Sequence, residues 1–246
     1  MIIVAALAGI LSVLTSWIVG GRLLLLARRT RQLPELLIGG ALFLAGGLWN
    51  PLVSTGRQAV GMPDDVRTAL VASGALAGAA GMTMLAIFNW RVYRPQARWA
   101  MALALAIGFA LAAAFVAQTV ANGWLEFART EHGPWLLGTW LGVVIYAWAS
   151  AEAWRQYRML ERRRALGLAD PIVTDRMRLW ALAMSAAFAG AGVLAVCQVL
   201  GVPVAGTTVG LVLTAVIALA ASSFLWLAFL PPGSYVARVR AAAEGN

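Results

Sequence analysis

The chain has 246 residues, of which 61% are hydrophobic and 12% are charged, and its mean hydropathy is +0.80. This composition excludes an ordinary soluble globular domain and is typical of an integral membrane protein. The net charge of +9 comes from 19 basic residues, all of them arginine, against 10 acidic ones. Because the arginines form short clusters between apolar runs, we expect them to set orientation and to contact lipid headgroups, and we expect no nucleic-acid partner.

Seven apolar segments follow one another, each of about the 20 residues that cross a hydrocarbon core of about 30 Å. We expect helices, because backbone groups in lipid must be hydrogen-bonded within their own segment. The sequence therefore predicts an all-α integral membrane protein: a seven-transmembrane-helix bundle in residues 1–230, followed by a short cytoplasmic interfacial helix and tail in residues 231–246. The segments lie at residues 2–27, 35–56, 67–90, 99–121, 135–157, 177–200 and 207–230.

The second segment is interrupted by Asn50-Pro51. Proline has no backbone N–H, so Pro51 leaves the carbonyl of Gly47 without its helical hydrogen bond. Gly46 and Gly47 leave space beside that carbonyl, and we expect the helix to kink there.

The third segment carries small residues at a helical spacing. Gly74 and Gly78 form a GxxxG step, and Gly81 continues it about one turn later. Lipid tails give apolar side chains little reason to leave them, so helices in membranes associate through close backbone contacts at such residues. We expect this face to pack against a neighbouring helix and to have no ligand role.

Burying a polar side chain within the membrane costs free energy, so we expect each such residue to have a structural or functional role. Several of them fall at a similar height toward the predicted outer side, and we expect them to line an outward-opening pocket for a small neutral or weakly polar ligand. The alternative is that they only hydrogen-bond between helices and hold the bundle together. The predicted ligand-binding residues are Trp49, Asn50, Gln118, Thr119, Gln198, Thr207 and Thr208.

Two charged residues fall near the inner ends of predicted spans, Arg22 in the first and Glu152 in the fifth. They are candidates for an ion pair within the membrane, and Glu152 is also a candidate proton carrier. The alternatives are that Arg22 extends its side chain to the interface and that Glu152 pairs with Arg155 or Gln156 on its own helix.

The outer loops carry five candidate metal ligands: Asp64, Asp65, Glu126, Glu131 and His132. Their spacing matches no metal motif, so we expect no metal site. The chain lacks the lysine of a retinal Schiff base and lacks the HExxH, GxSxG and glycine-rich phosphate-binding motifs. We therefore expect a protein that is not an enzyme and that holds no cofactor.

Arginine placement predicts the orientation. With the N-terminus outside, all but three of the 19 arginines fall on the inner side, the exceptions being Arg57, Arg67 and Arg129. This strong bias follows the positive-inside rule and places the C-terminus in the cytoplasm. We expect a multi-pass protein of a bacterial inner (cytoplasmic) membrane, with the lipid bilayer as its surroundings.

The stretch "LERRRALGLADPIVTDRMRLW" predicts a helical hairpin on the inner side between the fifth and sixth helices. Gly167 is suited to a left-handed helix C-cap, and Asp170-Pro171 is suited to the start of the next helix. The basic charge of the hairpin favours anionic headgroups or an acidic face of another protein. The predicted partner-binding residues are Arg158, Arg162, Arg163, Arg164, Arg176 and Arg178.

The segments "RLLLLARRTRQLPEL", "VYRPQARW" and "RRRALGLADPIVTDRMRLW" resemble the inner faces of uncharacterised bacterial seven-helix membrane proteins. In topology the chain is also similar to heptahelical receptors. That similarity is one of topology only, and fold does not fix function. The first hypothesis is a receptor-like sensor: a small molecule in the outer pocket shifts the fifth and sixth helices and changes what the hairpin presents to a separate cytoplasmic effector.

Two other functions stay open at this point. One is a small-solute or lipid transporter of 3+1+3 helix organisation, for which Pro34 and Pro171 at the starts of helices two and six are weak support. The other is a non-enzymatic subunit of a larger membrane complex. The sequence does not fix the oligomeric state.

Overall fold

The computed structural model describes residues 2–58, 61–130, 133–202 and 207–244. Within these ranges every regular element is a helix, and seven helices are long and apolar enough to cross a membrane. The predicted all-α class and the predicted number of helices able to cross a membrane are thereby confirmed, and these seven helices indicate a multi-pass membrane protein. The spans lie at Ile3–Thr30, Leu33–Gln58, Asp64–Tyr93, Arg98–Val120, Pro134–Ala165, Pro171–Val199 and Thr208–Phe229.

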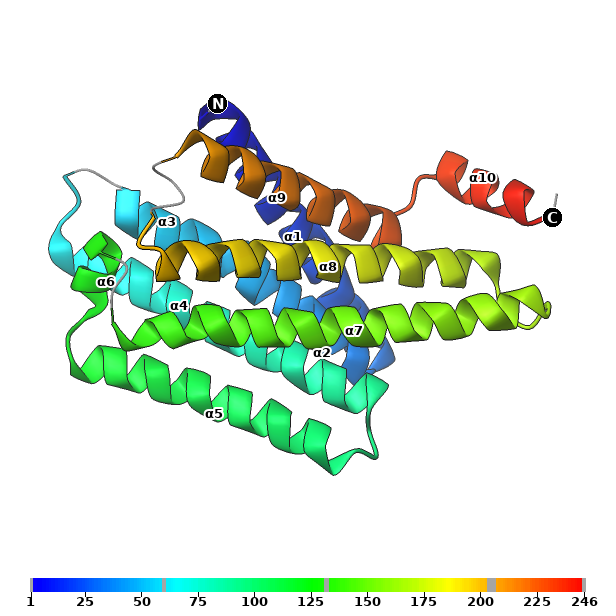
Figure 1. The fold of residues 1–246 in the computed structure, drawn as a ribbon, viewed down its shortest axis with the longest axis horizontal. Helices are drawn as coiled ribbons and strands as arrows, with labels where there is room; N and C mark the ends of the chain where they lie inside the picture. Colours follow the sequence, from blue (N-terminus) through cyan, green and yellow to red (C-terminus); the bar gives the residue numbers. More distant parts are fainter. Residues whose placement is uncertain (1, 59–60, 131–132, 203–206, 245–246) are drawn as a thin grey trace. The chain divides into compact units, whose positions relative to one another are not determined.

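The chain divides into two compact units. We call Ser16–Ile145 the N-terminal unit, and Tyr146–Asn246 together with Met1–Thr15 the C-terminal unit. Helices α1 (Ile2–Thr30) and α7 (Leu137–Ala165) contribute to both (Figure 1). The N-terminal unit also holds α2 (Leu33–Ala41), η1 (Leu42–Trp49), α3 (Asn50–Gln58), α4 (Asp64–Phe88), η2 (Asn89–Tyr93), α5 (Arg98–Val120), α6 (Trp124–Thr130) and η3 (Pro134–Leu136), and the C-terminal unit holds α8 (Pro171–Val199), α9 (Thr208–Phe229) and α10 (Gly233–Glu244).

Helix α4 is the central element of the N-terminal unit, because it contacts α2, η1, α3, α5 and α6. Its glycines allow these contacts. A Cβ atom on Gly81 would lie 2.6 Å from the backbone nitrogen of Ala45, and one on Gly78 would lie 2.9 Å from Cγ of Trp49. The predicted close packing at the GxxxG face is therefore confirmed.

The second span is not a uniform α-helix. Its middle part, η1, is π-helical, and it runs directly into α3 at Asn50-Pro51. Pro51 has no N–H to donate to the carbonyl of Gly47. That carbonyl accepts a hydrogen bond from Nε1 of Trp17 at 2.8 Å. The loss of a helical donor at this carbonyl stays a prediction, and a side chain of α1 donates a hydrogen bond to it.

In the C-terminal unit, α8 packs along α9, and α10 contacts α8 (Figure 1). Helix α10 confirms the predicted short helix after Pro231 and Pro232. The helix begins at Gly233, and Ser234 lies inside its first turn.

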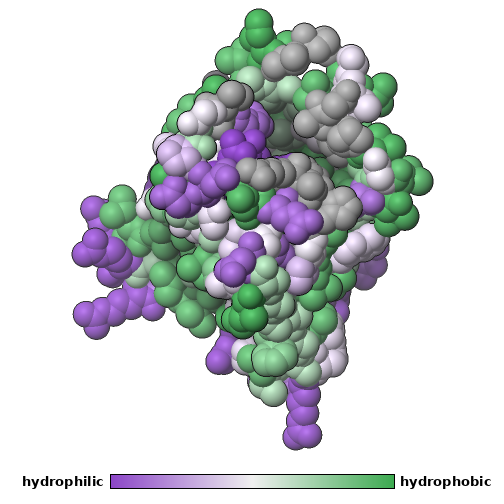
Figure 2. Space-filling model, turned by 90° about the vertical axis from the view of Figure 1, so that its left-hand side faces the viewer, coloured by the Kyte–Doolittle hydropathy of each residue, from purple (hydrophilic) through white to green (hydrophobic). Residues whose placement is uncertain are grey.

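Large apolar side chains remain exposed along the predicted spans, among them Phe109, Val120 and Val209. Figure 2 shows hydrophobic residues over much of the visible surface. Such exposure is unusual for a protein in water and suits a surface that contacts lipid tails.

Candidate functional site

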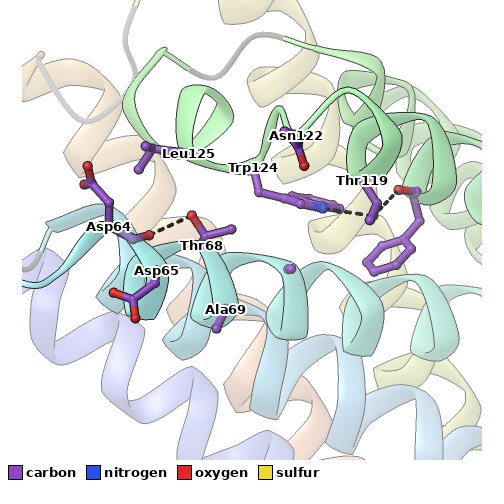
Figure 3. Close-up of a pocket in the computed structure, with 10 residues that line it drawn as sticks. Asp64, Asp65, Thr68, Ala69, Thr119, Asn122, Trp124 and Leu125 are labelled. Carbon is purple, nitrogen blue, oxygen red and sulfur yellow. Dashed lines mark hydrogen bonds between the residues drawn. The ribbon is translucent and has the colours of Figure 1, made fainter.

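A cleft of about 610 Å³ opens in the N-terminal unit where α4 begins, α5 ends and α6 begins (Figure 3). Its volume falls in the range of small-molecule sites. Three elements that are separate in sequence meet there because the chain turns back on itself after α5. The polar and aromatic residues of its lining are Asp64, Asp65, Thr68, Phe115, Thr119, Asn122 and Trp124.

The wall of the cleft is formed by Trp124, which is 3% exposed. Its Nε1 donates to Oγ1 of Thr119 at 3.0 Å, and that hydroxyl donates to the carbonyl of Phe115 at 2.8 Å (Figure 3). The Trp124 ring also packs against Phe115, with 5.1 Å between centroids, and against Trp135, with 5.8 Å. The hydrogen bonds and ring contacts together fix the orientation of this wall.

The rim of the cleft is acidic. Asp64 and Asp65 are the first two residues of α4, where the helix dipole stabilises negative charge. The hydroxyl of Thr68 donates to the backbone carbonyl of Asp64 at 2.7 Å. An aromatic wall beside carboxylates suits a ligand with an apolar body and a positively charged or hydrogen-bond-donating head.

Of the predicted ligand-binding residues, Thr119 lines this cleft. Its neighbour Gln118 is 1% exposed and holds the surrounding loop. The Gln118 amide donates to the carbonyl of Gly123 at 2.6 Å and accepts from the backbone N–H of Trp135 at 3.1 Å. Gly133 is in close contact with it, since a Cβ there would lie 2.5 Å from Oε1 of Gln118. For Gln118 the hydrogen-bonding alternative accounts for both of its polar atoms.

The remaining predicted ligand-binding residues lie outside the cleft lining. Trp49 packs over Gly78, and Asn50 is exposed at the start of α3. In the C-terminal unit Gln198 is half-buried, Thr208 is exposed, and the hydroxyl of Thr207 accepts from the N–H of Gly210 at 3.1 Å as the N-cap of α9. A single layer formed by all seven residues stays a prediction.

Glu152 is 4% exposed on α7, and its Oε2 lies 3.5 Å from Nη1 of Arg155. This confirms the predicted pairing with a residue on its own helix. Arg22 is exposed on α1, as expected of an arginine that extends to the interface. An ion pair between Arg22 and Glu152 and a proton-carrying role stay predictions.

The predicted hairpin between α7 and α8 is confirmed in its local geometry. Gly167 has φ +71°, the N–H of Leu168 donates to the carbonyl of Arg163 at 2.9 Å, and the N–H of Gly167 donates to the carbonyl of Arg164 at 2.9 Å. This pattern is a Schellman C-cap. Oδ1 of Asp170 accepts from the N–H of Ile172 at 2.6 Å and caps α8. The six predicted partner-binding arginines are all exposed.

A hydroxyl cluster between α7 and α8 was missed by the sequence analysis. Oγ of Ser185 accepts from Nε1 of Trp154 at 2.9 Å and lies 2.8 Å from Oγ of Ser150. Ser185 also donates to the carbonyl of Ala181 at 2.9 Å, so its only proton is used and Ser150 is the donor between the two serines. The spacing of Ser150 and Trp154 by one helical turn was the available signal.

Asn89 was also missed. It is fully buried at the start of the π-helical turn η2, and within the described ranges neither its Oδ1 nor its Nδ2 has a hydrogen-bond partner. An unsatisfied buried amide is rare and destabilising. No periodicity in the sequence distinguishes such a residue from a hydrogen-bonded one.

In the described part of the chain, no three His, Cys, Asp or Glu side chains are grouped so as to hold a metal ion. Glu131 and His132 lie outside the described residues. Comparison with known proteins finds no matching family model, curated relative or solved structure.

Proposed function

We propose that this chain is a receptor-like membrane sensor. In this proposal a small molecule binds in the cleft beside Thr119 and Trp124, and the α7–α8 hairpin carries the signal to a separate cytoplasmic protein. The observation that carries the proposal is the cleft itself, which combines a fixed aromatic wall, hydroxyl groups and an acidic rim.

The arginine bias supports an outward-facing cleft. The hairpin holds the densest arginine cluster, and the positive-inside rule assigns it to the cytoplasm. The cleft lies where α3 is followed by α4 and α5 is followed by α6, and the same rule assigns both connections to the outside. We take the membrane to be the bacterial inner membrane.

Helix α7 offers a direct route for the signal. It starts next to η3, where Trp135 contacts the cleft wall through Trp124 and is held by Gln118. It then runs without interruption for 29 residues, about 44 Å, to the hairpin. A ligand that moves Trp124 therefore acts close to one end of a continuous helix whose other end is the proposed output.

The chemistry of the cleft favours a small amine with an apolar body. The test uses purified protein in phosphatidylcholine nanodiscs, titrated with 2-phenylethylamine and with 2-phenylethanol as the matched neutral compound. Calorimetry should show tighter binding of the amine. Asp65→Asn should weaken amine binding and leave alcohol binding unchanged, whereas Trp124→Leu should weaken both. Glu35→Gln is the control, because it also removes one negative charge but lies outside the cleft lining.

If neither compound binds, or if Trp124→Leu binds like the unaltered protein, the cleft is not the ligand site. The transporter alternative is tested by labelling Thr68→Cys in a Cys197→Ala background with an impermeant maleimide. Labelling from the outside alone supports sensing, and labelling from both sides supports transport. The structure groups α5 with α4 in one unit, which favours sensing over a 3+1+3 organisation.

A further inference from the structure

The end of the α7–α8 hairpin, residues 158–170, is here called the hairpin tip. Its Schellman cap turns the chain so that two large apolar side chains have no cover within the described residues. Leu166 is 73% exposed and Leu168 is 74% exposed. Apolar side chains that are exposed close together and rimmed by charged residues are a feature of interaction surfaces, and these two leucines lie beside the arginines of the tip.

Residues 158–170 hold four arginines against two acids, Glu161 and Asp170, so the region keeps a net positive charge. Glu161 accepts from the hydroxyl of Tyr157 at 2.8 Å, and Asp170 caps α8. Asp175 accepts from Arg178 at 2.6 Å and from the hydroxyl of Tyr235 at 2.5 Å. Within the described residues no ion pair involves Arg158, Arg162, Arg163, Arg164 or Arg176. The tip therefore presents positive charge that the chain itself does not neutralise.

The length of α7 separates the tip from the bilayer. The predicted fifth span ends at residue 157, and α7 continues for eight more residues to Ala165, about 12 Å at about 1.5 Å per residue. The headgroup layer is about 5–7 Å thick on each side. The leucines therefore lie beyond the reach of lipid. A second copy of the chain is also disfavoured, because its cytoplasmic side is equally rich in arginine.

We propose that the hairpin tip docks onto a soluble cytoplasmic protein through an acidic surface that contains an apolar pocket, with Leu166 and Leu168 as anchors and Arg162, Arg163 and Arg164 as the charged rim. This inference rests on the proposed function for its orientation. It adds the chemistry of the effector: burial of the two leucines in an apolar pocket contributes affinity, and the arginines contribute further contacts, charge selection and a fast, salt-dependent association.

The test is photo-crosslinking in intact cells with p-benzoylphenylalanine in place of Leu168. The matched control carries it in place of Phe109, which is 78% exposed on a predicted span. We expect one discrete adduct from position 168, with a protein of acidic isoelectric point, and lipid adducts from position 109. The purified partner should then bind nanodiscs holding this protein, with an affinity that falls at least tenfold in 0.5 M salt.

Charge reversal at Arg162, Arg163 and Arg164 to Glu should abolish the adduct, as should Leu166→Ala. Arg240→Glu on α10 should leave it unchanged, and the thermal unfolding of each variant shows whether it is folded. A lipid adduct at position 168, an adduct with a second copy, no adduct, or an adduct insensitive to charge reversal would each overturn the inference.

A failure of the docking inference can be distinguished from a failure of the sensing proposal. If phenylethylamine binds in the cleft and the tip forms no adduct, only the docking inference is lost. If the adduct forms and the cleft binds neither compound, the docking inference stands and the sensing proposal is lost.

Discussion

The indole N–H of Trp17 donates a 2.8 Å hydrogen bond to the carbonyl of Gly47, the group that in an α-helical register would accept from residue 51, which is a proline. The contact is possible only because position 47 is glycine, since a Cβ atom there would lie 2.3 Å from Cδ1 of Trp17. Three residues from two candidate spans are thus related: a proline with no N–H to donate, a glycine that gives access to its carbonyl and a tryptophan that donates to that carbonyl.

Trp17→Phe should lower the free energy of unfolding by about 1–3 kcal/mol, because it leaves a part-buried carbonyl unsatisfied while keeping an aromatic ring. Thermal unfolding in detergent measures the loss. Trp140→Phe, at a residue that is 45% exposed, should change it by less than about 0.5 kcal/mol. In a Pro51→Ala background the cost of Trp17→Phe should shrink, because residue 51 then carries an N–H. Equal costs in the two backgrounds would contradict this account.

Gly81→Ala should destabilise the protein by about 1–3 kcal/mol. Its Cβ would lie 2.6 Å from the backbone nitrogen of Ala45 and 3.1 Å from the carbonyl oxygen of Ala41, and backbone cannot rotate away as a side chain can. Gly21→Ala is the matched control, because nothing lies within 4 Å of the added atom. It should be neutral or stabilising through helix propensity. Equal melting temperatures for the two variants would refute the packing argument.

Gln118→Leu should release the loop that holds η3. It removes the donor to the Gly123 carbonyl and the acceptor for the Trp135 N–H, and both groups lose a buried partner. Hydrogen exchange should show faster exchange of the Trp135 amide, with an overall loss of about 2–3 kcal/mol. Gln156→Leu, at a side chain with no hydrogen bond among the described residues, should leave exchange at Trp135 unchanged. Unaltered protection in Gln118→Leu would argue against the role of this amide.

Asn89→Leu should behave in the opposite way to Gln118→Leu. The Asn89 amide is buried without a partner in the described part of the chain, so an apolar side chain of similar size removes a desolvation penalty. We expect an equal or higher melting temperature. A loss of more than about 1 kcal/mol would instead mean that the amide holds a buried water or ligand.

Tyr235 joins α10 to α8 through a hydrogen bond to Asp175. Its burial is the largest cause that raises the pKa of Tyr235 above its usual value of 10.0, and the hydrogen bond to Asp175 is the next. A raised pKa means that the contact contributes its full stabilisation of the folded state below pH 10. This stabilisation is lost as the pH rises through the higher folded-state pKa. The protection factors of the α10 amides, which correct for the base-catalysed rise of exchange with pH, should therefore fall above pH 10. Tyr235→Phe should show lower protection already at neutral pH and no further fall above pH 10. Identical pH profiles for the two proteins would exclude the contact as the attachment of α10.

Several features followed from the sequence because they depend on neighbours along the chain. The seven spans need only apolar runs of sufficient length, and the hairpin needs only Gly167 to end one helix and Asp170 to begin the next. The carbonyl that Pro51 deprives of a donor is likewise fixed by helical geometry, four residues back.

The partners of those groups depended on how the helices are rotated and aligned, which no local pattern specifies. Gln118 and Thr119 are adjacent in the sequence, yet Thr119 lines the cleft and Gln118 closes the loop, because successive helical residues point about 100° apart. The cleft itself required Asp64, Phe115 and Trp124 to meet from three elements. The sequence alone therefore determined which segments form apolar helices long enough to cross a membrane and where the chain turns. The tertiary structure decided which polar groups are hydrogen-bonded and which line the cleft, because hydrogen bonds across helices depend on packing that sequence spacing does not encode.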